Sequence, residues 1–156
     1  MKLSDECANF TLNTLNSGST TPNNTEFTNI NMQNILGDMY DKYNKFVLIC
    51  TSYATGDKTG GVDGISQVVQ YKISGLSFSN AGYNNSGAST SPVFAVYPLL
   101  PRHSYVFGIN NVRVCFYKPP PIVNLRIVVE NIKLQQPSTY TTEFILYQFN
   151  IFWLYD

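Results

Sequence analysis

Charged side chains are scarce in this chain of 156 residues. Asp, Glu, Lys and Arg make up 13% of it, whereas a typical soluble domain contains about 25%. The 10 basic and 10 acidic groups also cancel, which excludes a nucleic-acid binder that neutralises phosphates with clustered Lys and Arg. A coiled coil is excluded too, because it would be rich in Glu and Lys.

Long apolar runs are also missing. The apolar run at residues 46–50 (FVLIC) is far shorter than the ~20 residues that a membrane helix needs. Residues 1–13 contain a single Lys, the acids Asp5 and Glu6, and no apolar segment of the kind found in signal peptides. We therefore expect no direct membrane insertion, no export and a reducing compartment.

Residues that bind metals or act as nucleophiles are few. The only histidine is His103, and Cys7, Cys50 and Cys115 form no CxxC pair, so the sequence offers neither a zinc site nor a recognisable nucleophile and base. Each cysteine lies in a strand-like stretch. We expect buried free thiols, with one disulfide and a leftover thiol as the alternative.

The nearest approach to a ligand-binding motif is the glycine-rich stretch at residues 54–64 (ATGDKTGGVDG). It lacks the GxxxxGK[ST] spacing of a phosphate-binding loop, and Asp57 and Asp63 lack the spacing of a calcium-binding EF-hand loop. The sequence therefore predicts a turn region here, and a protein with no enzymatic activity, no metal and no cofactor.

Three kinds of residue are abundant. Apolar residues make up 44% of the chain, aromatic residues make up 14%, and Asn, Ser and Thr together exceed a quarter of it. This composition excludes a disordered chain and favours strands joined by polar loops. Alternation with period two at residues 8–13, 112–117, 123–130 and 143–155 predicts half-buried strands. The apolar run at residues 45–53 predicts a central strand covered on both faces.

One stretch departs from the strand pattern. Apolar residues between positions 32 and 43 recur at helical spacing, which predicts one short helix near residues 34–40. About eight strands without alternating helices predict an all-β fold. We expect a single eight-stranded antiparallel jelly-roll sandwich with one short helix, spanning residues 1–156 as one domain, with the first and last long strands as neighbours.

The last predicted strand, residues 143–155 (EFILYQFNIFWLY), is apolar on both faces. A sandwich strand needs only one apolar face for the core. The second face must then be covered, either by the helix and loops of this chain or by another subunit. The candidate interface residues on that second face are Phe144, Leu146, Phe152 and Leu154.

Three consecutive prolines, Pro119, Pro120 and Pro121, follow the strand at residues 112–117. Such a run is stiff and extended. We expect an exposed connector, which serves either as a plain spacer or as a docking segment at an interface.

Two segments carry a resemblance to a known family. Residues 35–43 (ILGDMYDKY), followed by the strand at residues 46–50, and residues 70–76 (QYKISGL), with Phe78 close behind, resemble a minor virion protein of nucleocytoplasmic large DNA viruses. The long aromatic terminal strand is similar as well. The resemblance implies a single jelly-roll minor capsid or penton-type subunit beside a double jelly-roll major capsid protein, and it implies no catalytic residue.

The favoured hypothesis is therefore a structural virion protein. It would pack as a homo- or hetero-oligomer beside the major capsid protein and other minor capsid proteins, in a virion assembled in the host cytoplasm. The alternative is a jelly-roll carbohydrate- or receptor-binding module that uses Tyr, Trp153, Asn and Asp side chains to hold its ligand.

Overall fold

The structure is a computed structural model that describes residues 1–17, 22–55, 67–79, 82–83, 89–99, 104–107, 112–131, 136–137 and 144–156. Its main elements, in chain order, are β1 (Lys2–Leu3), β2 (Ala8–Asn13), the 3-10 turn η1 (Thr14–Ser17), β3 (Asn24–Asn31), α1 (Met32–Leu36), α2 (Met39–Lys42), β4 (Lys45–Thr55), β5 (Gln67–Ser74), β8 (Val93–Leu99), β9 (Ser104–Phe107), β10 (Val114–Tyr117), β11 (Ile122–Asn131) and β13 (Ile145–Tyr155). Three two-residue strands, β6 (Gly82–Tyr83), β7 (Ser89–Thr90) and β12 (Gln136–Pro137), complete the set.

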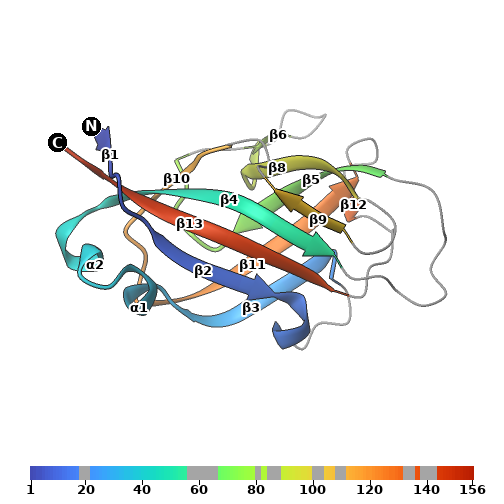
Figure 1. Ribbon diagram of the computed structural model, residues 1–156, viewed down its shortest axis with the longest axis horizontal. Coiled ribbons are helices and arrows are strands. Elements are labelled where there is room, and N and C mark those ends of the chain that lie inside the picture. The colour runs from blue at the N-terminus through green and yellow to red at the C-terminus, as the bar shows by residue number, and fades with distance from the viewer. Residues whose placement is uncertain are drawn as a thin grey trace.

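The strands pair as if one long hairpin had been folded and then rolled up (Figure 1). Antiparallel pairs join β5 to β8, β4 to both β9 and β10, β3 to β11, and β2 to β13. Rolling adds the antiparallel pairs β4 with β13 and β5 with β11. Each outer pair therefore encloses the inner ones along the sequence.

Two sheets result from this winding. The six-stranded sheet has the order β1-β13-β4-β10, with β2 on β13 and β9 on β4, and the five-stranded sheet has the order β12-β11-β5-β8, with β3 on β11. The chain crosses from one sheet to the other at each step from β2 to β5. This is the arrangement of a jelly roll, so the predicted all-β jelly-roll sandwich is confirmed, as is the pairing of the first and last long strands.

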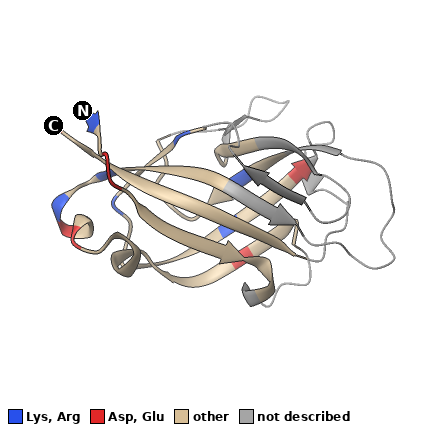
Figure 2. Ribbon diagram, in the orientation of Figure 1, with Lys and Arg blue, Asp and Glu red and all other residues tan. Residues whose placement is uncertain are grey.

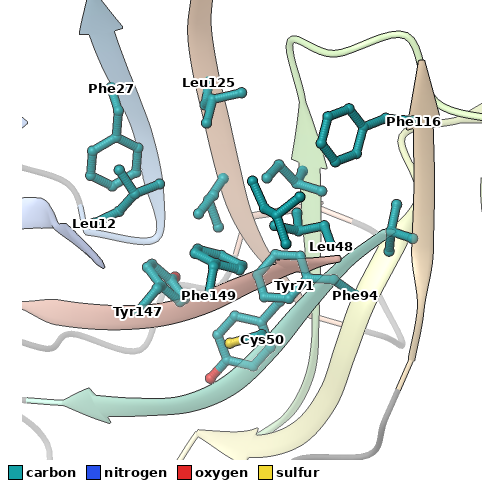
Figure 3. Packing of buried hydrophobic residues seen from close by; sticks show 14 of the residues in the cluster. Leu12, Phe27, Leu48, Cys50, Tyr71, Phe94, Phe116, Leu125, Tyr147 and Phe149 are labelled. Carbon is teal, nitrogen blue, oxygen red and sulfur yellow. The ribbon is translucent and has the colours of Figure 1, made fainter. Parts of the chain in front are cut away.

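Aromatic rings fill the space between the two sheets (Figure 3). Tyr147 and Phe149 project from β13, and Tyr71 and Phe94 project toward them from the opposite sheet. The ring centroids of Phe94 and Phe149 are 5.5 Å apart and those of Tyr71 and Tyr147 are 6.1 Å apart, both in edge-to-face geometry. Such contacts add to the burial of apolar area that holds the sheets together.

The helical region differs from the prediction of one helix near residues 34–40. Two short helices form, α1 and α2, and they are separated at Gly37. Gly37 has a φ of 58°, a conformation that glycine adopts readily and that ends a helix. At the other end of α1, the Asn31 side chain accepts a hydrogen bond of 2.9 Å from the Asn34 amide, which is a standard N-cap.

Candidate interaction surface

The inner and outer faces of β13 follow the predicted alternation. Ile145, Tyr147, Phe149 and Ile151 are each at most 1% exposed and belong to the core. The other row, with all four candidate interface residues, is half-buried and points away from the core. Phe144 comes directly before β13, and Leu146, Phe152 and Leu154 lie on it.

Strand register assembles an apolar group around Phe152. Phe152 lies directly opposite Val47 of β4, and Val47 in turn lies opposite Cys115 of β10. Directly paired residues share a face of the sheet. Val47 is only 2% exposed although it does not belong to the cluster between the sheets.

The next pairs extend this group toward the edge of the sheet. Leu154 lies opposite Leu3 of β1, and Ile49 of β4 lies opposite Asn150. We call the resulting apolar surface the outer patch, which consists of Leu3, Val47, Ile49, Cys115, Phe152 and Leu154. Phe144 and Leu146 are not part of it, because Gln148 and Asn150 separate them from Phe152 along the outer row of β13.

The outer face of the five-stranded sheet has a different chemistry. Lys72 and Glu130 form an ion pair of 3.1 Å there, and Arg126 forms another of 2.8 Å with Glu26. Figure 2 shows charged residues along β3, β5 and β11, whereas the described middle parts of β2, β4 and β13 carry none. Of the two outer faces, as far as the structure describes them, that of the six-stranded sheet combines the outer patch with uncharged polar residues such as Asn9, Thr11, Gln148 and Asn150, whereas that of the five-stranded sheet carries the ion pairs.

The chain's own α1 helix serves the core. Its buried residues are Met32 and Leu36, both members of the core cluster, and it packs against β2 and β11 at one end of the sandwich (Figure 1). Of the two alternatives for the second face of β13, cover by this chain or by another subunit, the first is therefore not provided by α1. Residues 56–66 and 138–143 lie outside the described residues.

The proline run is fixed to the helices instead of standing free. Pro119 is buried, and its carbonyl accepts a hydrogen bond of 2.7 Å from the Tyr40 hydroxyl. The Pro121 carbonyl accepts one of 2.8 Å from the Met32 amide at the start of α1. The prediction of an exposed segment is thus wrong for Pro119, while Pro120 and Pro121 are exposed. The run connects β10 to β11.

A second feature lies near one end of the outer patch. Six residues line a hollow of about 320 Å³, namely Ser4, Asp5, Glu6, Tyr43, Trp153 and Tyr155. We call it the aromatic hollow. The rings of Tyr43 and Trp153 stack there with centroids 6.0 Å apart and planes 15° apart.

The other candidates from the sequence are the three cysteines, His103 and the glycine-rich stretch. None of the three cysteines forms a disulfide; Cys50 is buried, and Cys7 and Cys115 are half-buried. His103 and residues 56–64 of the glycine-rich stretch, with Asp57 and Asp63, lie outside the described residues, while residues 54–55 belong to β4. Among the described residues, no three His, Cys, Asp or Glu side chains gather as metal ligands would, and neither helix could cross a membrane.

Comparison with known proteins adds no family. No protein-family model matches the chain, and no curated protein matches it at a significant level. The class of protein that the coordinates define is an all-β jelly roll, and its function has to be argued from its surfaces.

Proposed function

We propose that this chain is a structural virion protein, a minor capsid or penton-type subunit that packs beside the major capsid protein of a large DNA virus. It would be assembled into the virion in the host cytoplasm, and the proposal assigns it no catalytic role. The observation that carries the proposal is the outer patch, because it places apolar side chains on the side of the sheet that faces away from the core.

The fold supports this proposal without deciding it. Jelly rolls serve as capsid subunits and as lectins. Residues 35–43 and 70–76, which resemble a minor virion protein, contain the end of α1, all of α2 and residues 70–74 of β5. Of these elements, β5 contributes Tyr71 and Ile73 to the core, whereas no residue of α2 is buried. The strand at residues 46–50, which belongs to the same resemblance, supplies Val47 and Ile49 of the outer patch.

The chemistry of the outer patch suits a contact with protein. Interface cores are depleted in charge and enriched in aromatic side chains, and Phe152 supplies an aromatic ring beside aliphatic neighbours. The opposite face, with its two ion pairs, would remain toward solvent or form the polar rim of a contact. We therefore propose that the chain is oriented with its six-stranded sheet toward the neighbouring subunit.

The proposal is tested by co-expressing the chain with the major capsid protein of the same genome and sedimenting the assembled particles. We expect the wild-type chain in the particle fraction and Phe152→Asp at the top of the gradient. A matched control is Ile122→Asp, because Ile122 is 56% exposed and belongs to the other sheet; it should sediment with the particles. Circular dichroism of each variant separates loss of attachment from loss of folding. A wild-type chain that never leaves the top of the gradient would contradict the proposal.

The second candidate is a carbohydrate- or receptor-binding module, and the aromatic hollow is the observation that favours it. Aromatic faces next to hydrogen-bonding groups, here Ser4 and the carboxylates Asp5 and Glu6, are features of small-molecule sites. A glycan array probed with the purified chain tests this candidate. Specific hits that Trp153→Ala abolishes would favour it over the capsid role, and an array without hits would remove the carbohydrate form of it.

A further inference from the structure

A bulge in the edge strand creates the aromatic hollow. Both β1 and β2 pair with β13, through Leu3 opposite Leu154 and Ala8 opposite Ile151. Between these pairs, four residues of the edge strand (4–7) face only two of β13 (152–153). The extra residues must swing away from the ladder, and they carry Asp5 and Glu6 around Trp153.

Hydrogen bonds through Ser4 hold this bulge in place. The Ser4 amide donates to the Trp153 carbonyl at 2.9 Å, and the Trp153 amide donates back to Ser4 Oγ at 3.1 Å. Ser4 Oγ then donates to the Glu6 carbonyl at 2.7 Å. Ser4 is only 7% exposed. The backbone that presents the two carboxylates is therefore ordered before any ligand arrives, which lowers the entropic cost of binding.

Three aromatic side chains form the rest of the wall. Trp153 packs against the core on one side and stacks on Tyr43, and both are half-buried. Tyr155 is 37% exposed and continues the same row of β13. The described lining thus combines aromatic rings with two exposed carboxylates, and none of its six residues carries a positive charge.

The neighbouring hollow provides a useful contrast. It measures about 590 Å³, shares Tyr43 and Tyr155 with the aromatic hollow, and contains Lys42 and Lys45. Lys45 Nζ lies 5.2 Å from the ring centroid of Tyr117, so it already rests on another ring. The carboxylates of the aromatic hollow and the lysines of its neighbour line different spaces on either side of two shared tyrosines.

We propose that the aromatic hollow binds a cationic side chain, arginine or lysine, of a partner polypeptide. Positive groups are attracted to the faces of Trp and Tyr rings, and a guanidinium also pairs with carboxylates in its own plane. A neutral sugar would use the rings equally well but would gain no charge attraction from the two exposed carboxylates. This inference does not depend on the capsid role, since it concerns a different surface from the outer patch.

Trp153 allows a direct test, because it is the only tryptophan of the chain. The folded full-length chain is titrated with a short Arg-Gly-Arg peptide at low salt while tryptophan fluorescence is recorded. We expect a saturable change in fluorescence that weakens as salt is added. Methyl glucoside, titrated in the same way, should produce no saturable change.

Variants assign the binding to the hollow. Asp5→Asn with Glu6→Gln should weaken peptide binding about fivefold, as the loss of two exposed charge pairs implies. The matched control neutralises the exposed pair Asp38 and Asp41 near α2, which removes the same charge and should leave binding unchanged.

The opposite results would overturn the proposal. Equal weakening by both double variants would mean that only net charge matters, and unchanged binding after neutralising Asp5 and Glu6 would place the peptide elsewhere. Saturation by methyl glucoside but not by the peptide would assign the hollow to a sugar. Tyr43→Leu, which keeps the reporter, should also weaken the peptide at least twofold; if that variant does not fold, the charge variants still decide.

Discussion

Truncation of two phenylalanines of β13, Phe149 and Phe152, tests which face of the strand is buried, because the loss of unfolding free energy should be large on the inner face and small on the outer face. Phe149 is 1% exposed, with ring centroids 5.2 Å from Phe10 and 5.5 Å from Phe94. Phe149→Ala would leave a cavity between the sheets, and such changes cost about 3–5 kcal/mol. For a chain of this size that corresponds to a loss of about 6–20 °C in melting temperature.

Phe152→Ala removes the same atoms three positions further along. Because Phe152 is half-buried on the outer face, its truncation leaves a surface depression that water fills, and we expect a cost of about 1 kcal/mol or less in the isolated chain. Guanidinium unfolding followed by circular dichroism measures both values, and an unchanged m-value confirms that the same transition is compared. Equal costs for the two variants would refute the assignment of Phe152 to an outer face, and with it the outer patch.

Other substitutions test the rest of the structure by the same unfolding assay. Gly75→Ala should be severely destabilising or should prevent folding, because Gly75 has a φ of 112° and a Cβ there would lie 2.0 Å from the Asn124 carbonyl oxygen; a soluble variant of wild-type stability would show that this close approach is absent. Lys72→Met should cost about 3 kcal/mol, since it leaves Glu130 without its cation at a site where both side chains are nearly buried. Arg126→Ala should cost about 1 kcal/mol or less, because its ion pair is exposed. If the two ion-pair variants were equally stable, the difference in burial would not matter as argued.

The sequence predicts the strands well because burial alone sets their pattern. The alternation at residues 143–155 identifies the buried row of β13 without any knowledge of its partners. The helical stretch is harder, because its apolar spacing continues past Gly37 while the backbone turns there. The buried Pro119 accepts a hydrogen bond from the Tyr40 hydroxyl, 79 residues away, and local composition does not predict a contact over that distance.

The candidate surfaces depend on register, which a single sequence does not specify. Phe152 and Leu154 stand out as a second apolar row, but Val47 and Cys115 join them only through pairing across three strands. The one signal for Val47 is the uninterrupted apolar run at residues 46–50, which predicts a strand covered on both faces. The aromatic hollow is harder still to predict from the sequence, because the bulge at Ser4 is defined only by how the edge strand pairs with β13.

The proposed capsid role is tested by locating this chain and its contacts in assembled particles. Cryo-electron microscopy of the particle at side-chain resolution would show which face of the sandwich meets a neighbouring subunit. If the chain is a capsid subunit, we expect Phe152 and Leu154 to be buried against capsid protein, while Arg126 and Glu26 face solvent or a polar rim. A particle in which the outer patch faces solvent, or from which the chain is absent, would contradict the proposed role.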